Sequence, residues 1–181
     1  MKEMSVAEIT AQMVKDLRAM TGAGPKECKD ILTQTDGDMK KAIEALREKG
    51  MKVSEKVQGR EALEGRIEIY VHPGARMATM VELSCETDFV ARTEDFTQLA
   101  KDLALHIAAM NPKYIRVEDI PEAEVTASGL TAAKYAEEVA LMSQPYVKDG
   151  SQSIDDKIKA TVAKVRENVV VRRYVRYEIG S

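Results

Sequence analysis

Long apolar runs are missing from this 181-residue sequence. No stretch approaches the roughly twenty apolar residues that a membrane-spanning helix needs. The first residues, Met1 to Ser5, have no signal-peptide core and lead directly into a helical pattern. We therefore expect a cytoplasmic protein that does not bind a membrane.

Cysteine is also scarce. Cys28 and Cys85 are the only two, they lie far apart, and each falls on an apolar face with no histidine nearby to share a metal. Two isolated thiols predict neither a disulfide framework nor a metal centre, and reduced, buried side chains are expected. We accordingly expect no cofactor and no bound metal.

The charge balance has no strong sign, with a net charge of −3, 31% charged residues and 44% hydrophobic residues. This composition is typical of a soluble globular protein. Residues 172–177 interleave three arginines with two tyrosines, as RNA-binding surfaces do, but no wider basic stripe accompanies them. A strand face that is solvated or meets a protein partner is therefore favoured, and no direct nucleic-acid binding is expected.

Motifs of catalysis are absent: the sequence has no nucleophile elbow, no HExxH, no phosphate-binding loop ending in Lys-Ser/Thr and no paired-cysteine motif. His72 falls in an expected turn and His106 on the polar edge of an expected helix, so neither joins a convergent constellation. The segment Thr21-Gly22-Ala23-Gly24 joins helix to helix, which favours capping over phosphate binding. We expect no enzyme, since an enzyme would need a convergent polar pocket.

Helical spacing dominates the first fifty residues. Ser5 and Glu8 form a capping box at the start of a first helix, which ends at Gly22 in a left-handed cap. Its apolar residues recur at Val6, Ile9, Met13, Leu17 and Met20.

Two more short helices follow. Pro25 fits the first turn of the second helix, Asp38 caps the third, and Gly50 is expected to end the third. Three short amphipathic helices over residues 1–51 predict a small bundle, which is more often a docking module than a catalytic body.

Residues 52–64 lose this periodicity and are interpreted as a linker, with room for a helical turn. From Gly65 the period changes to two, and the segment from His72 to Ala75 predicts a hairpin turn before a second strand that ends at Cys85.

The expected core covers residues 65–181. Thr93 starts a long amphipathic helix, and Ser153 with Asp156 caps another. The chain closes on a strand whose odd-numbered apolar residues are expected to share one face. They are Val169, Val171, Val175, Tyr177 and Ile179. Together these elements predict an α+β fold, a small three-stranded antiparallel sheet covered by helices.

One connection stands out. Glu86, Thr87 and Asp88 are turn and cap residues that deliver Phe89 and Val90 into the segment before the Thr93 helix. One interpretation tucks both apolar side chains into the core, which predicts little exposed aromatic surface. The other presents a rigid aromatic beside a carboxylate, ready to enter a partner.

Several motifs, in one order over nearly the whole chain, resemble the elongation factor Ts family, the guanine-nucleotide exchange factors of elongation factor Tu. The matching stretches are Leu17-Arg18, Thr21-Gly22-Ala23-Gly24, Glu27-Cys28-Lys29, Gly37-Asp38, residues 42–50, Cys85-Glu86-Thr87-Asp88-Phe89-Val90-Ala91-Arg92, Gln144-Pro145-Tyr146-Val147-Lys148-Asp149 and Val171-Arg172-Arg173-Tyr174-Val175-Arg176-Tyr177-Glu178.

The resemblance implies a ubiquitin-associated-like N-terminal domain that docks on the GTPase, and a core loop that dislodges the magnesium ion of the GTPase without covalent chemistry. The implied docking residues are Arg18, Thr21, Gly22, Ala23, Gly24 and Cys28. The implied loop residues are Thr87, Asp88, Phe89 and Val90. A single copy of the core motifs implies a homodimer. The alternative is a helical adaptor that binds a GTPase or ubiquitin-like partner without promoting exchange.

Overall fold

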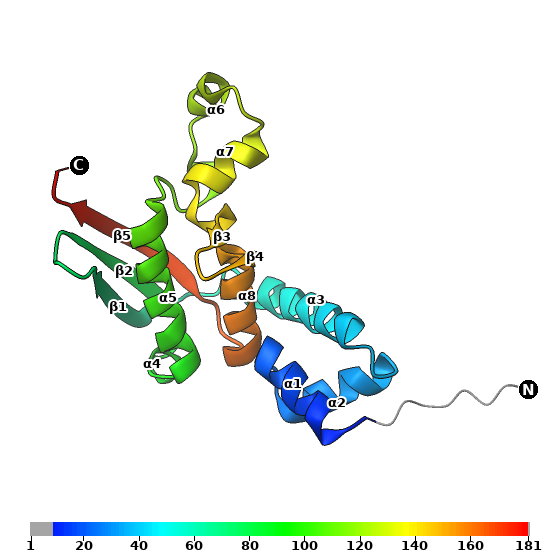
Figure 1. The fold of residues 1–181 in the computed structure, drawn as a ribbon. Helices are drawn as coiled ribbons and strands as arrows, with labels where there is room; N and C mark the ends of the chain where they lie inside the picture. The colour runs from blue at the N-terminus through cyan, green and yellow to red at the C-terminus, as the bar shows by residue number, and fades with distance from the viewer. Residues whose placement is uncertain (1–8, 181) are drawn as a thin grey trace, which may run out of the picture.

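The computed structural model describes residues 9–180, an α+β fold with three helices at its N-terminal end (Figure 1). These helices are α1 (Ala11–Thr21), α2 (Pro25–Gln34) and α3 (Met39–Val57). Three predicted boundaries are confirmed. Gly22 is left-handed at the end of α1, Pro25 opens α2, and the Asp38 carboxylate accepts the N–H groups of Lys40 and Lys41 at the start of α3.

The start of α1 differs from the prediction. The capping box of Ser5 and Glu8 lies outside the described residues, and the described helix begins at Ala11. Its cap is Thr10, whose hydroxyl accepts the N–H of Met13 at 3.2 Å. Thr10 therefore satisfies a free amide of the first helical turn.

The predicted end of the third helix at Gly50 is wrong, because α3 continues to Val57. Gly50 instead permits a close helix contact: a Cβ at this position would lie 3.3 Å from Cβ of Ala163 in α8 (Ile154–Val165). Val57 then enters the main core. The helix therefore occupies the first part of the stretch 52–64 that was expected to be a linker, and the division into a docking unit, a linker and a core stays a prediction.

The predicted three-stranded antiparallel sheet is confirmed, with the order β1-β2-β5. Its strands are β1 (Glu64–Val71), β2 (Met77–Cys85) and β5 (Val170–Glu178). The helices that follow β2 are α4 (Asp88–Ala91), α5 (Glu94–Met110), α6 (Glu122–Ser128), α7 (Ala132–Val139) and α8, with short 3-10 turns at Val117–Asp119 and Leu141–Ser143. A small hairpin of β3 (Pro145–Tyr146) and β4 (Asp149–Ser153) precedes α8.

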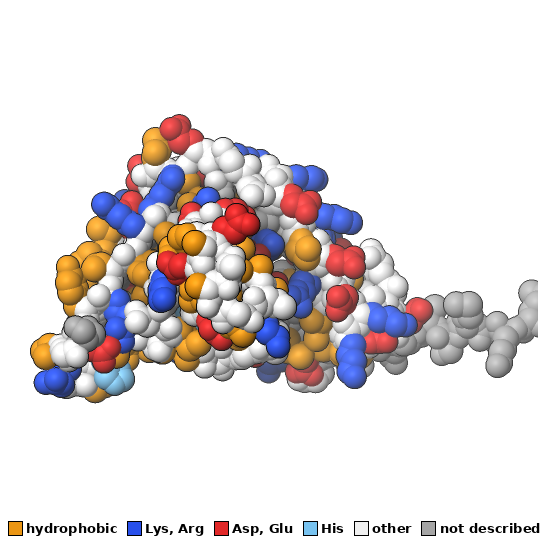
Figure 2. All heavy atoms as spheres, turned by 90° about the horizontal axis from the view of Figure 1, so that it is seen from above, with side chains coloured by type: hydrophobic (Ala, Val, Ile, Leu, Met, Phe, Trp, Pro, Cys, Tyr) orange, Lys and Arg blue, Asp and Glu red, His pale blue; other side chains and the backbone are white. Residues whose placement is uncertain are grey.

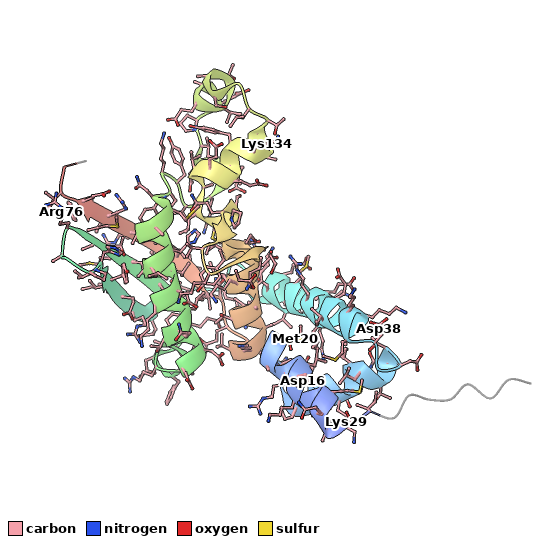
Figure 3. The ribbon with its side chains drawn as sticks, viewed as in Figure 1. Asp16, Met20, Lys29, Asp38, Arg76 and Lys134 are labelled. Carbon is pink, nitrogen blue, oxygen red and sulfur yellow. The ribbon has the colours of Figure 1, made fainter. Side chains whose placement is uncertain are left out.

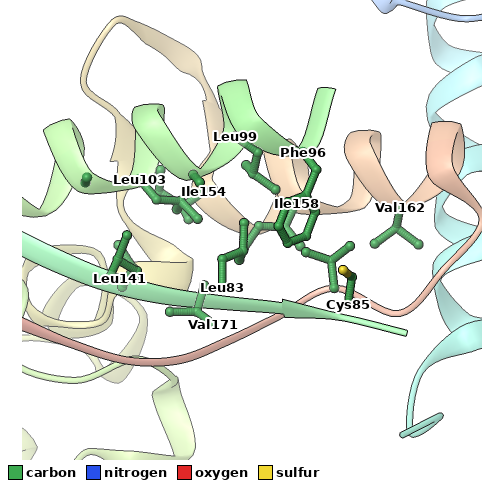
Figure 4. Packing of buried hydrophobic residues seen from close by; sticks show 14 of the residues in the cluster. Leu83, Cys85, Phe96, Leu99, Leu103, Leu141, Ile154, Ile158, Val162 and Val171 are labelled. Carbon is green, nitrogen blue, oxygen red and sulfur yellow. The ribbon is translucent and has the colours of Figure 1, made fainter. Parts of the chain in front are cut away.

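The main core lies between one face of the sheet and helices α5 and α8. Figure 4 shows Phe96 and Leu99 of α5 on the side of the helix that faces Leu83 of β2. Thr93 caps α5 and the Ser153–Asp156 capping box opens α8, both as predicted. These caps fix where the two covering helices begin.

The prediction that the odd-numbered apolar residues of the last strand share one face is wrong. Arg172 is the extra residue of a β-bulge, since Val171 pairs with Leu83 while Arg173 already pairs with Glu82. Val171 is therefore buried in the core, whereas Val175 and Tyr177 beyond the bulge point to the opposite side.

That opposite side of the sheet is exposed and largely apolar, and the Arg173–Glu82 ion pair is its charged part. We call this side the open sheet face, and its apolar residues are Ile67, Ile69, Val71, Met80, Val175 and Tyr177. Its β1 side chains are more than half exposed. Figure 2 shows hydrophobic side chains gathered along the left edge of the molecule, the end at which the sheet lies in Figure 1.

The prediction that His106 lies on the polar edge of a helix is also wrong, because its side chain is fully buried. Its Nδ1 accepts the N–H of Val147 at 3.2 Å, so the neutral ring carries its proton on Nε2 and donates to Oε1 of Gln144 at 3.0 Å. Burial lowers the pKa of His106, although the hydrogen bond with Gln144 opposes this shift. The ring is therefore held neutral.

No helix within the described range is long and apolar enough to cross a membrane.

Stability should fall as the pH is lowered from 7 to 5. The unfolded chain protonates His106 near pH 6.5, whereas the folded chain does so only at lower pH, so the unfolded state binds more protons in between. The free energy of unfolding should decrease there by at most about 1.4 kcal/mol per pH unit. Urea denaturation at pH 7, 6 and 5 measures this slope. His106→Gln should flatten it, and an unchanged slope in His106→Gln would contradict the assignment.

Candidate functional site

The residues Thr87–Val90, here called the TDFV turn, connect β2 to α5. Instead of an irregular loop they open the four-residue helix α4, which Thr87 caps by accepting the N–H of Val90 at 3.4 Å. The Thr93 hydroxyl donates to the Val90 carbonyl at 2.8 Å and also caps α5. The turn is thus held between two threonine caps.

The two apolar side chains of the TDFV turn are placed differently. Phe89 is 80% exposed, so the interpretation that buries it in the core is wrong. Val90 is partly buried and packs against the main core, and the next residue, Ala91, is buried. Val90 therefore anchors the turn, while Phe89 projects from it.

Asp88 lies beside the projecting aromatic. Its Oδ2 is 2.9 Å from Nη2 of Arg92, one helical turn further on. The Arg92 side chain is 79% exposed and that of Asp88 is 46% exposed, so solvent screens this pair and it contributes little to stability. The carboxylate remains accessible to donors on another molecule.

A network of two carboxylates joins the TDFV turn to the segment between α8 and β5. Oε2 of Glu167 accepts the N–H groups of Glu86 and Thr87 at 3.1 and 3.0 Å, and Oε1 accepts the Thr87 hydroxyl at 2.7 Å. In return, the Glu86 carboxylate accepts the N–H of Asn168 at 2.7 Å and lies 3.6 Å from Arg60. We call these residues the Glu86–Glu167 network. The sequence did not reveal Glu167, because its partners lie about 80 positions away.

Cys85, at the end of β2, is structural. Its Sγ–H donates to the Thr87 carbonyl at 3.1 Å. Burial raises the pKa of the Cys85 thiol to about 11, and the nearby negative charge of Glu167 adds to the shift. The thiolate that nucleophilic chemistry requires is therefore disfavoured at neutral pH.

The second candidate surface is the turn between α1 and α2. The Thr21 hydroxyl donates to the Leu17 carbonyl at 2.7 Å and accepts the N–H of Ala23 at 3.3 Å. Cys28 is fully buried and its Sγ–H points to the Ala23 carbonyl at 3.6 Å. Thr21 and Cys28 therefore shape this turn, while Arg18, Gly22 and Gly24 are exposed at its surface.

Both candidate surfaces lie at the same end of the molecule, where α1 and α4 appear at the bottom of Figure 1. Lys164 of α8 connects them. Its Nζ is 2.8 Å from Asp95 in the first turn of α5, and a Cβ added to Gly22 would overlap it. Met20, at the end of α1, lies close to α8 in Figure 3 and is 66% exposed.

Among residues 9–180, no group of three or more His, Cys, Asp or Glu side chains is arranged to hold a metal ion. The three arginines of β5 contact the protein itself. Arg172 and Arg176 donate to the carbonyls of Ala62 and Ala108, and Arg173 pairs with Glu82.

The chain is similar in sequence to one family model and to several known proteins. The family model described as Elongation factor TS matches residues 5–133. Elongation factor Ts of Herpetosiphon aurantiacus is 46% identical over an alignment that covers 96% of this chain and 98% of the relative. The proteins of the same name from Thermodesulfovibrio yellowstonii and Syntrophus aciditrophicus are 46% and 44% identical, each over 96% of this chain and 97% of the relative.

The two phenylalanines should differ sharply in their contribution to stability. Phe89→Ala should change the free energy of unfolding by less than about 0.5 kcal/mol, because the side chain is exposed. Phe96→Ala should cost about 3–5 kcal/mol, because it empties a buried site. Urea denaturation at neutral pH measures both. A large loss in Phe89→Ala would show that Phe89 packs in the folded protein.

Proposed function

The chain belongs to the elongation factor Ts family of translation elongation factors, and from this we propose that it is a guanine-nucleotide exchange factor. In this proposal it binds elongation factor Tu carrying GDP and promotes GDP release, so that GTP can load. The observation that carries the proposal is the exposed Phe89 side chain on a turn whose backbone is fixed.

The target of such a factor is sensitive to small movements. GDP is held by phosphate contacts and by Mg²⁺, which demands near-ideal octahedral geometry. A slight displacement of the GTPase loops that supply this geometry therefore weakens nucleotide binding disproportionately.

The TDFV turn has the properties of a wedge. Phe89 offers a large apolar surface with only two side-chain torsions, so little conformational entropy is lost when it enters a pocket. Asp88 beside it can accept hydrogen bonds from the partner, and Thr87 and Val90 hold the turn to the core.

The turn between α1 and α2 would provide the docking contact. Arg18, Gly22 and Gly24 are exposed there, and Met20 adds apolar surface. Since this turn and the TDFV turn lie at one end of the molecule, a single GTPase can contact both. Thr21, Ala23 and Cys28 would act by keeping the docking turn in shape.

Exchange then follows from coupled binding. A protein that binds the nucleotide-free GTPase more tightly than the GDP form must weaken GDP binding by the same factor. A coupling free energy of about 3 kcal/mol corresponds to a factor of roughly 150. No covalent step is required.

Catalytic amounts of this protein should accelerate the release of fluorescently labelled GDP from elongation factor Tu. Phe89→Ala should reduce the maximal release rate at least about tenfold and weaken binding less, because the lost contact acts on the magnesium site. Leu63→Ala is a matched control, since Leu63 is 76% exposed and lies outside the turn. Full exchange by Phe89→Ala would refute the role of Phe89 as a wedge. Binding of the wild-type protein without GDP release would favour the adaptor alternative.

A homodimer is the second part of the proposal, and the open sheet face supports it. Antiparallel sheets with one solvated face usually carry polar residues on that face, whereas here all three strands present apolar side chains beside the Arg173–Glu82 ion pair. A contiguous exposed apolar patch marks an interaction surface. Two copies related by a two-fold axis would cover it with the same residues from each chain.

Ile69→Glu, in the middle of the open sheet face, should shift the protein toward monomer because each dimer would bury two unpaired carboxylates. Sedimentation velocity at micromolar concentrations measures the oligomeric state. Val117→Glu is the control, since Val117 is also an exposed apolar residue but belongs to the 3-10 turn Val117–Asp119 and not to a strand of the open sheet face. If both variants sediment as the wild type does, the open sheet face is not the dimer interface.

A further inference from the structure

The TDFV turn is too short to hold its own orientation. Helix α4 has four residues, and one helical turn in water is marginal because nucleation fixes several torsions for a single hydrogen bond. The Asp88–Arg92 pair is exposed and screened. The direction in which Phe89 projects must therefore be set by contacts from elsewhere in the chain.

Glu167 provides the most concentrated of these contacts. One carboxylate accepts two backbone N–H groups and one hydroxyl, at 3.1, 3.0 and 2.7 Å, all from Glu86 and Thr87. Hydrogen bonds to a charged acceptor are roughly twice as strong as neutral ones. These bonds fix the two peptide groups that lead directly into the TDFV turn.

Glu167 is itself held in place. Arg166 is left-handed, with φ of 59°, and ends α8 so that Glu167 turns toward β2. The next residue, Asn168, donates its backbone N–H to Glu86 at 2.7 Å and its side-chain amide to the Arg60 carbonyl at 2.7 Å. The segment that carries the carboxylate is thus tied to the strand end that it holds.

We propose that Glu167 is a positioning residue for nucleotide exchange: it holds the backbone of Glu86 and Thr87 so that Phe89 projects in one direction. The assignment rests on the proposed exchange function. Three donors of its own chain occupy the carboxylate, so it acts through Phe89 and not by contact with the GTPase.

GDP release from elongation factor Tu, measured against the concentration of this protein, tests the exchange role. Glu167→Ala should lower the maximal release rate about tenfold and change the half-saturating concentration less than about twofold, because the docking turn is untouched. Glu167→Gln should recover most of the rate, since its amide oxygen still accepts the two backbone N–H groups.

Asn168→Ala is the matched control. It removes a neighbouring side-chain hydrogen bond to Arg60 but leaves all three bonds of Glu167 in place. Its release rate should stay within about twofold of the wild type. If Asn168→Ala lost as much rate as Glu167→Ala, or if Glu167→Ala changed only the half-saturating concentration, the positioning role would be overturned.

A second measurement does not depend on exchange. The sequence has two phenylalanines, so 4-fluorophenylalanine labelling gives one ¹⁹F signal from exposed Phe89 and one from buried Phe96. Glu167→Ala should move and narrow the Phe89 signal toward that of a freely rotating ring and leave the Phe96 signal in place. Glu167→Gln should restore the Phe89 signal. An unchanged Phe89 signal in Glu167→Ala would refute positioning.

The two measurements separate this inference from the exchange function. If the wild-type protein released no GDP, the exchange function would fail, while the ¹⁹F signals would still decide whether Glu167 orients Phe89. If Glu167→Ala lost the Phe96 signal through unfolding, Thr87→Val would replace it. This variant removes the hydroxyl donor to Glu167 at 2.7 Å together with the cap on the Val90 N–H, and it leaves both backbone N–H bonds of Glu167 in place. A Phe89 signal unchanged in Thr87→Val would then count against the proposal.

Discussion

Burial of one sheet face beneath α5 and α8 is the constraint from which the positions of the candidate surfaces follow. Val81, Leu83 and Cys85 of β2 are fully buried against these helices, so the direction in which β2 ends is set by the core. The TDFV turn begins two residues later and α5 must start where its apolar stripe meets the sheet. The turn therefore has only a short chain with which to connect two fixed ends, and it emerges at the edge of the core with Val90 inside and Phe89 outside.

Local patterns predicted the elements of this fold well. The caps at Asp38, Thr93 and Ser153 are confirmed because a short polar side chain next to an apolar periodic stretch satisfies free amides wherever it occurs. The TDFV turn was located for the same reason, and its resemblance to a known family suggested its use. Gly50 misled the prediction because a glycine that ends a helix and one that lets two helices approach look identical in a sequence.

What could not be predicted depends on partners distant in the chain. The β-bulge at Arg172 arises from the pairing of β5 with β2 and reverses the faces of every residue after it. The alternation of apolar and polar residues along β1 likewise predicted two faces, but it did not indicate which face the helices cover. The polar side packs toward α5, where Arg66 donates to Thr97 at 2.8 Å, and the apolar side stays open. The bonds of Glu167 and the burial of His106 are of the same kind, because each is decided by a segment brought near only by folding.

An exposed aromatic that must act as a wedge raises conflicting demands, since the packing that would fix it would also hide it. The structure separates the two requirements. Apolar contacts hold Val90 and Ala91 on the inner side of the turn, and hydrogen bonds to the backbone hold its entry, so neither touches the face that Phe89 presents. Polar bonds suit this purpose because they are directional and fix peptide groups without covering the ring. The rigidity of the turn and the exposure of its aromatic therefore come from different residues, and each can be altered without the other.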